Sequence, residues 1–318
     1  MLRACISWCR EFFFSSVQVA HLPADWSAAG SERVPRILCA NHPSSFLDPI
    51  IVASFVPFKL AFLARGDAFT PRFNAFLRNY LNMMPVWRRR DGLAQVPRNY
   101  ETFDLCLQKW RQGGSLIIFS EGLCVQEWKL RTLSKGTARL VLQAAREGID
   151  LEVVPVGINY AHFSGPGKAY ELKFGPPVKA SVLWQQWLPE GQVPADLEEA
   201  ESARFLVRFN RWLQAEMEPL VLSEAAILEA SRKTKVRKGM LWLSRFLHAP
   251  YYMPLRHLVG RACRDTVHFD SVLFAVLLFT YPLYLGLIGG ALTLWQGTEA
   301  LPLVSVWPLA AYWSRRGT

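Results

Sequence analysis

Short apolar runs alternate with stretches of helical spacing along the first two thirds of the chain. Three of the runs predict strands buried inside a sheet, because they are rich in β-branched and aliphatic residues: Arg36–Ala40, Gly114–Ser120 and Leu151–Val156. Apolar residues recur at helical spacing over Pro97–Arg111 and Lys135–Glu147, which predicts helices that cover the sheet. The pattern therefore predicts an α/β fold with a central mixed β-sheet covered by helices.

The last fifty residues follow a different pattern. Residues 271–296 carry no charged side chain, and about 20 apolar residues suffice for a helix to cross the hydrocarbon of a bilayer. The next apolar run, 300–313, is shorter and contains two prolines, which predicts a return as a membrane hairpin or a re-entrant segment. The alternative is a helical hairpin buried in a soluble domain. We expect an α/β domain over 1–225, a basic juxtamembrane segment over 226–270 and a membrane hairpin over 271–318.

The first residues of the chain predict a short helix. Leu2, Ile6, Cys9 and Phe13 lie at helical spacing, which is typical of an interfacial helix and equally of a first helix packed on the core. Charged residues interrupt this apolar stretch and no cleavage site of small residues follows, so a secretory signal is not expected.

Charge indicates how the chain meets a membrane. The net charge is +10, and 51% of the residues are hydrophobic, with 12 Trp and 20 Phe. No Asp or Glu occurs between residues 230 and 264, whereas nine basic residues do: Arg232, Lys233, Lys235, Arg237, Lys238, Arg245, Arg256, Arg261 and Arg264. Basic residues that flank an apolar segment stay on the cytoplasmic side of a membrane, so we expect an integral membrane protein whose catalytic domain faces the cytoplasm. The same basic residues are expected to contact anionic lipids. Nucleic-acid binding is not expected, because the basic run adjoins the apolar segment and no nucleic-acid motif is present.

The six cysteines indicate reduced thiols in a cytosolic compartment. They are scattered without the spacing of a zinc or redox site. Cys124 lies near Glu121, but no base close in the sequence makes it a nucleophile. The histidines do not suggest a metal site either.

Candidate chemistry follows the first predicted strand. His42 and Asp48 lie just beyond Arg36–Ala40, at the carboxyl end of a strand, where ligands usually bind in open α/β sheets. An aspartate bonded to one ring nitrogen leaves the other nitrogen free to accept the proton of an alcohol. The alternative is that Asp48 caps a helix and His42 is an ordinary turn residue.

Four segments occur in an order that strengthens the chemical interpretation. They are Asn41-His42…Asp48, Met84-Pro85-Val86-Trp87-Arg88, Phe119-Ser120-Glu121-Gly122 and Val154-Pro155-Val156-Gly157. From about residue 15 to about residue 180, the chain thus resembles the glycerolipid acyltransferase family, which includes 1-acylglycerol-3-phosphate and glycerol-3-phosphate acyltransferases. The first segment is assigned to the family's His-x4-Asp motif.

The resemblance implies roles for individual residues. His42 and Asp48 are expected to be catalytic, and Glu121 is expected to help bind the acceptor. Glu121 follows a predicted strand, and Gly122 would permit a tight turn that exposes it at the same sheet edge as His42. Asn41 is a further candidate for substrate binding. Without the resemblance, Glu121 could equally cap a helix or form a salt bridge.

The phosphate-binding cations depart from the family pattern. Ser120 stands where proline is common, and Leu123-Cys124 replaces the usual Thr/Ser-Arg, which removes one cation. By analogy we assign acceptor binding to Arg88, with Arg131 and Lys135 as further candidates, because guanidinium groups bind phosphate through paired hydrogen bonds.

These features predict a membrane-bound O-acyltransferase of phospholipid synthesis. His42 would deprotonate the hydroxyl of glycerol phosphate or lysophosphatidate, which attacks an acyl thioester carried by acyl-CoA or acyl-carrier protein as co-substrate. No cofactor, metal or covalent acyl-enzyme is required. Three alternatives stay open: a non-phosphate acceptor such as an N-acylated amino acid, a catalytically inactive lipid-binding membrane protein, and a thioester hydrolase.

Overall fold

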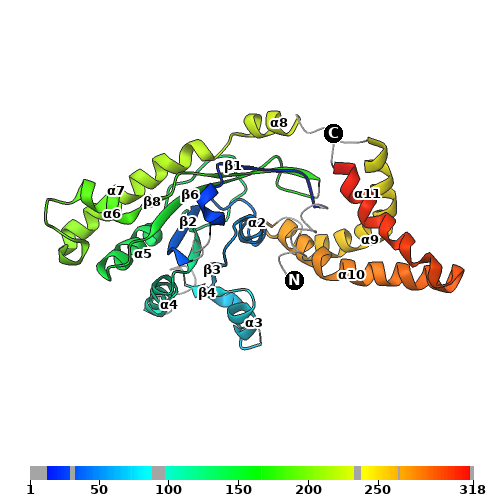
Figure 1. Cartoon of the computed structure of the whole chain (residues 1–318), viewed down its shortest axis with the longest axis horizontal. Coiled ribbons are helices and arrows are strands. Elements are labelled where there is room, and N and C mark those ends of the chain that lie inside the picture. Colours follow the sequence, from blue (N-terminus) through cyan, green and yellow to red (C-terminus); the bar gives the residue numbers. More distant parts are fainter. Residues whose placement is uncertain are drawn as a thin grey trace.

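A mixed β-sheet forms the centre of the molecule (Figure 1). The computed structural model describes residues 13–28, 33–72, 74–87, 97–165, 167–232, 238–263 and 266–315. In this part of the chain, the sheet has eight strands: β1 (Phe14–Ala20), β2 (Arg36–Ala40), β3 (Leu60–Arg65), β4 (Met83–Val86), β5 (Ser115–Phe119), β6 (Glu152–Tyr160), β7 (Lys168–Phe174) and β8 (Val178–Lys179). Their order is β1-β7-β6-β2-β5-β3-β4, and β8 pairs with β6.

The centre of the sheet is parallel. Strands β6, β2, β5, β3 and β4 pair in parallel, whereas β7 and β8 run antiparallel to β6. The predicted mixed sheet is therefore confirmed. The register aligns Ala40 of β2 with Phe119 of β5, so the segments that follow these two strands emerge side by side at one edge.

Helices cover both faces of the sheet. The helices of the described residues are α2 (Leu47–Phe55), α3 (Asn74–Asn79), α4 (Asn99–Arg111), α5 (Lys135–Arg146), α6 (Ala180–Trp187), α7 (Glu199–Met217), α8 (Glu224–Arg232), α9 (Lys238–Cys263), α10 (Phe269–Gln296) and α11 (Val306–Arg315). Short 3₁₀ segments are η1 (Ala24–Ser27), η3 (Gly66–Ala68), η6 (Pro194–Asp196), η7 (Glu218–Leu220) and η8 (Thr298–Ser305).

Alternate residues of the strands face two separate cores. In β2, Ile37 and Cys39 pack in a core that contains buried residues of α4, α5, α6 and α7. Leu38 and Ala40 point to the other face, where α2 and the first turns of α10 supply the partners. This alternation follows from the period of two in a strand, and burial on both faces explains why the four residues of β2 after Arg36 are apolar.

The strongest sequence patterns are confirmed. Strand β2 coincides with the predicted range, and β5 lies within its predicted range. Helices α4 and α5 likewise lie within the two predicted helices. The third predicted strand continues to Tyr160, four residues farther than expected, and this extension pairs with β7.

The C-terminal region is a group of helices beside the sheet (Figure 1). The predicted basic segment, 226–270, includes most of α8 and all of α9, and residues 233–237 and 264–265 lie outside the described residues. Hydrogen bonds join α9 to its neighbours: the Tyr284 hydroxyl donates to the Leu247 carbonyl at 2.9 Å, and the Trp307 indole donates to the same carbonyl at 3.1 Å. Tyr281 and Tyr284 thus pack against a neighbouring helix.

Among the described residues, α10 is the one helix that is long and apolar enough to cross a membrane. Its first turns belong to the core, since Phe269, Leu273 and Phe274 are buried. Farther along the helix, large apolar side chains are exposed, such as Leu287 at 74% and Leu294 at 91%. The membrane evidence is thus a single apolar helix whose second half is largely uncovered.

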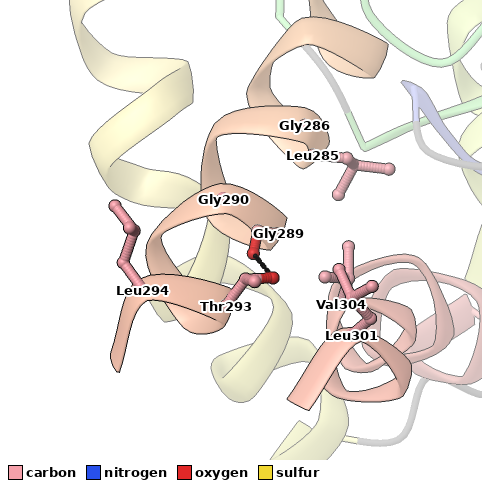
Figure 2. A pocket seen from close by; sticks show the side chains of 8 residues that line it. All are labelled: Leu285, Gly286, Gly289, Gly290, Thr293, Leu294, Leu301 and Val304. Atoms are coloured by element: carbon pink, nitrogen blue, oxygen red, sulfur yellow. Dashed lines mark hydrogen bonds between the residues drawn. The ribbon is translucent and has the colours of Figure 1, made fainter. Parts of the chain in front are cut away.

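The chain reverses direction after α10, and the membrane hairpin stays a prediction. Gly297 adopts a φ of 82°, and η8 then packs on α10. A shallow apolar pocket lies between them, where Leu301 and Val304 face Gly289 (Figure 2). Helix α11 has only ten residues, so at about 1.5 Å per residue it is too short to span a bilayer. The predicted N-terminal helix lies outside the described residues except for Phe13, which is buried.

Candidate active site

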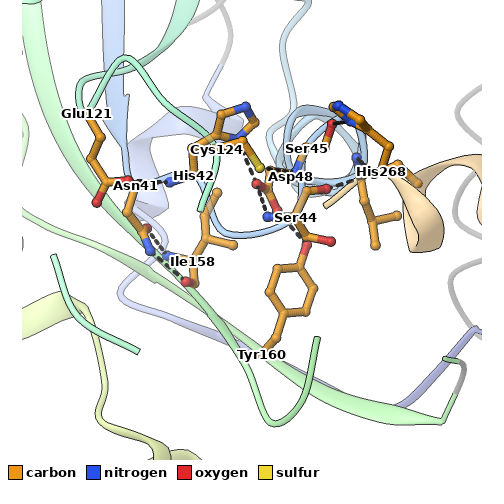
Figure 3. A network of polar contacts seen from close by, with 12 residues as sticks. Asn41, His42, Ser44, Ser45, Asp48, Glu121, Cys124, Ile158, Tyr160 and His268 are labelled. Carbon is orange, nitrogen blue, oxygen red and sulfur yellow. Dashed lines mark hydrogen bonds and ion pairs between the residues drawn. The ribbon is translucent and has the colours of Figure 1, made fainter. Parts of the chain in front are cut away.

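His42 and Asp48 form a hydrogen-bonded pair at the carboxyl edge of the sheet (Figure 3). The Nδ1 atom of His42 lies 2.8 Å from Oδ2 of Asp48. Asp48 stands in the first turn of α2 and its side chain is fully buried, whereas the His42 side chain is 18% exposed. The structure therefore brings together the two residues predicted to be catalytic, and their catalytic role stays a prediction.

The spacing of this pair corrects the sequence interpretation. His42 and Asp48 are six positions apart, so five residues separate them, one more than in a His-x4-Asp motif. The chain accommodates the loop through a turn at Ser45, which adopts a left-handed φ of 48°. Two backbone hydrogen bonds close the turn, from the Leu47 N–H to the Ser44 carbonyl and from the Asp48 N–H to the Ser45 carbonyl. The longer loop therefore still delivers the carboxylate to the imidazole.

Two further donors hold the Asp48 carboxylate. The Ser44 backbone N–H donates to Oδ2 at 2.8 Å, and the Tyr160 hydroxyl donates to Oδ1 at 2.7 Å. Such bonds are needed because a buried carboxylate without partners is costly. Burial and the neighbouring Asp48 raise the pKa of Tyr160 well above its ordinary value, so the phenol stays protonated and can donate. The sequence interpretation did not assign Tyr160, since it lies beyond the predicted end of β6.

The second imidazole nitrogen is available for chemistry. Among the described residues, no hydrogen bond reaches Nε2 of His42. The ring stacks on Phe119 with centroids 3.8 Å apart and planes 13° apart, which fixes its orientation. An oriented imidazole with a free nitrogen is suited to accept a proton from a bound alcohol.

Glu121 braces the histidine segment. One carboxylate oxygen accepts the His42 backbone N–H at 3.3 Å, and the other accepts the Arg131 backbone N–H at 3.0 Å. Burial raises the pKa of Glu121, and these two backbone N–H groups act in the opposite direction. The turn depends on Gly122, which adopts a φ of 72°. Glu121 thus lies at the same edge as His42, as predicted, and its contact with an acceptor stays a prediction.

Asn41 joins the strand end to β6. Its side-chain amide donates to the Ile158 carbonyl at 2.9 Å and accepts the Ile158 N–H at 2.7 Å. The residue is only 3% exposed. The structure therefore gives Asn41 a bracing contact, and a contact with substrate stays a prediction.

The predicted cations are only partly described. Arg88 lies outside the described residues. The Arg131 guanidinium donates to Glu127 at 2.9 Å, and Lys135 is an exposed residue at the start of α5. Arg65, which the sequence interpretation missed, ends β3 at the same edge and lies close enough to His268 to help lower the pKa of that residue. A basic residue at the last position of a strand would have been its only sequence signal.

The part of the chain that contains this site matches a known protein family. Residues 26–159 match the family described as Acyltransferase, a range that contains His42, Asp48 and Glu121. This part of the chain is an acyltransferase domain. The family and the class of enzyme predicted from the four segments are therefore confirmed.

One solved structure similar to this chain is the crystal structure of the 1-acyl-sn-glycerophosphate acyltransferase PlsC from Thermotoga maritima. The two share 20% sequence identity over 67% of this chain and 78% of that chain, with a TM-score of 0.42. No curated protein matches the chain.

Cys124 is an unsuitable nucleophile in the acyltransferase domain. Burial, followed by the charge of Asp48, raises the pKa of its thiol to about 12, so the thiolate is scarce at neutral pH. Its sulfur instead accepts the Ser45 N–H at 3.0 Å. No group of three metal-binding side chains occurs within the described ranges.

The Tyr160 contact gives a first prediction. Replacing Tyr160 with phenylalanine removes the donor to Oδ1 of Asp48 and preserves the buried ring. We expect kcat for acyl transfer to fall by about tenfold, because a hydrogen bond to a charged group contributes about 1.5–3 kcal/mol. Steady-state kinetics measure this change, with Tyr80→Phe as the control because Tyr80 is 74% exposed. An unchanged kcat in Tyr160→Phe would contradict a role for this bond in holding Asp48.

Proposed function

We propose that the protein is a membrane-bound O-acyltransferase that transfers a fatty acyl group from an acyl thioester to a hydroxyl of glycerol phosphate or lysophosphatidate. The observation that supports this most strongly is the arrangement of His42. Its Nδ1 contacts the buried carboxylate of Asp48. Its Nε2 accepts no hydrogen bond from the described residues, and the ring is partly exposed at the carboxyl edge of the sheet.

The proposed reaction is a single displacement through a tetrahedral intermediate. The acceptor hydroxyl gives its proton to Nε2 of His42 as its oxygen attacks the thioester carbonyl. Asp48 stabilises the resulting imidazolium through Nδ1, and the intermediate then collapses and breaks the carbon–sulfur bond. The imidazolium returns the proton to the departing thiolate, so the products are an ester and a free thiol. General-base catalysis of this kind contributes about 10²–10⁴ in rate.

The donor in this proposal is acyl-CoA or an acylated carrier protein. Both present the same thioester to the site. Neither donor requires the chain to hold a metal or an organic cofactor.

Membrane attachment belongs to the same proposal. The part of α10 that follows Leu278, residues 279–296, is about 27 Å long at about 1.5 Å per residue, close to the thickness of the hydrocarbon core. The basic residues of α9, such as Arg245 and Arg256, suit the headgroups of anionic lipids. With both flanks of the apolar hairpin basic, the acyltransferase domain faces the cytoplasm.

A second acceptor class is supported by the segment after Glu121. Leu123-Cys124 occupies the place where the family carries a cation, and Cys124 is partly buried next to Ser45. Fewer cations favour an acceptor without a phosphate, such as an N-acylated amino acid with a free hydroxyl.

An assay of thiol release distinguishes these proposals. The purified protein, in vesicles that contain anionic lipid, is given acyl-CoA with lysophosphatidate, glycerol 3-phosphate or an N-(hydroxyacyl) amino acid. We expect thiol release and ester formation with one of the two phosphate acceptors. Thiol release with the N-(hydroxyacyl) amino acid alone would establish the acceptor class without a phosphate. Thiol release without any acceptor would indicate a hydrolase. An absence of release with acyl-CoA and with acyl-carrier protein would contradict the enzyme proposal.

A further inference from the structure

The first turn of α10 contacts the loop that separates His42 from Asp48. The Ser271 hydroxyl accepts the Leu47 N–H at 3.0 Å and donates to the Ser44 carbonyl at 2.8 Å. Ser44 and Ser271 are both buried, at 0% and 2% exposure. One hydroxyl therefore bridges two backbone groups of the loop, and the N–H of Ser44 in turn bonds to Asp48.

A second contact reaches the strained residue of this loop. The Ser45 hydroxyl lies 2.6 Å from Nδ1 of His268, the residue that precedes α10 (Figure 3). Ser45 has the left-handed backbone that side chains other than glycine rarely adopt, and such a conformation persists only where its surroundings hold it. Burial, then the charges of Arg65 and His42, lower the pKa of His268, which favours a neutral ring beside Ser45.

A buried ion pair fixes the helix start itself. Asp270 pairs with Lys168 at the beginning of β7, and both side chains are fully buried. The other oxygen of Asp270 accepts the Gly165 N–H at 2.7 Å. The Lys168 ammonium also lies 4.6 Å from the ring centroid of Tyr160, which is the tyrosine that donates to Asp48. The start of α10 thus reaches Asp48 indirectly: His268 and Ser271 contact the loop that contains Ser44, and Asp270 pairs with the lysine that lies beside Tyr160.

We propose that the first turn of α10 positions the His42–Asp48 loop, with Ser271 as the principal positioning residue. The helix that anchors the protein in the bilayer would then also hold the catalytic turn in its active geometry. Ser271 acts through the backbone of Ser44 and Leu47 and touches neither substrate nor imidazole. This inference rests on the proposed function of His42 and Asp48.

The test compares two hydroxyl deletions in α10, made in the full chain in anionic vesicles. Ser271→Ala removes the bridge to the loop without adding bulk. Thr293→Val is the matched control, because the Thr293 hydroxyl donates to the Gly289 carbonyl of its own helix and lies away from the loop. We expect Ser271→Ala to lower kcat by about 10- to 100-fold and to change KM by less than about twofold. Misplaced catalytic groups slow the chemical step far more than they weaken the binding of substrate. Thr293→Val should keep the wild-type kcat.

Hydrogen exchange provides a readout that needs no turnover. In Ser271→Ala we expect the amides of residues 44–48 to exchange about tenfold faster, because the Leu47 N–H keeps only the Ser44 carbonyl as acceptor and the loop loses its bridge to α10. The same amides should exchange at the wild-type rate in Thr293→Val. Wild-type kcat and exchange in Ser271→Ala would overturn the positioning role, and so would equal losses in the two variants. An inactive wild-type protein would instead reject the proposed function, and the exchange rates would still decide whether Ser271 holds the loop.

Discussion

Replacing His42 with alanine is expected to lower kcat for acyl transfer by about 10² to 10⁴-fold and to leave the protein folded. The alanine cannot accept the hydroxyl proton, while Asp48 keeps its bonds from Ser44 and Tyr160. The fold is expected to survive because the imidazole is partly exposed and its main packing contact is one face of Phe119. Thiol release under saturating donor and acceptor measures the first effect, and thermal unfolding measures the second.

The control for this variant is a histidine outside the site. His257 is exposed on α9, so His257→Ala should retain the wild-type kcat. If His42→Ala transferred acyl groups at the wild-type rate, the imidazole would not be the base. If His42→Ala unfolded at a much lower temperature than His257→Ala, its loss of activity would have a structural cause.

Replacing Lys168 with methionine is expected to cost about 3 to 5 kcal/mol in the free energy of unfolding. The substitution leaves the Asp270 side chain fully buried without its counter-charge. The effect should exceed that of most single substitutions, because the pair joins β7 to the start of α10 with no exposure to solvent. Denaturant unfolding in a mild detergent gives the change in free energy.

A double substitution separates the ion pair from simple packing. Lys168→Met with Asp270→Asn removes both charges, and the asparagine oxygen can still accept the Gly165 N–H. We expect the double variant to recover most of the lost stability, because a buried pair replaced by neutral groups is often tolerated. Equal destabilisation in the single and double variants would show that the charge of Asp270 is not the cause.

The sequence was sufficient for the centre of the fold. Strands β2 and β5 have uninterrupted apolar runs because both of their faces are buried, and α5 has a wide apolar stripe. His42 and Glu121 each follow a predicted strand, so the sequence predicts both at the edge where the strands end. The structure adds that β2 and β5 are direct neighbours, which brings the Glu121 carboxylate to the His42 N–H.

The parts that could not be predicted depend on contacts between distant segments. The apolar run of β3, Leu60–Arg65, suits a helix as well as a strand, so its pattern alone does not place Arg65 at the site. Lys168 is charged, yet it is buried because Asp270, 102 positions later, neutralises it. The bridge from Ser271 to Ser44 spans 227 positions and has no local signal.

The continuity of α10 has a consequence for how the enzyme meets its lipids. The same helix begins in the core beside the catalytic turn and ends in turns whose own apolar side chains are exposed. No linker separates these two parts of the helix. If α10 spans a bilayer as proposed, the acyltransferase domain would have no flexible tether on which to swivel or rise, and His42 would be kept at one height above the membrane plane. An acceptor lipid would have to diffuse laterally to that fixed position, and its headgroup would have to extend to the depth of the imidazole.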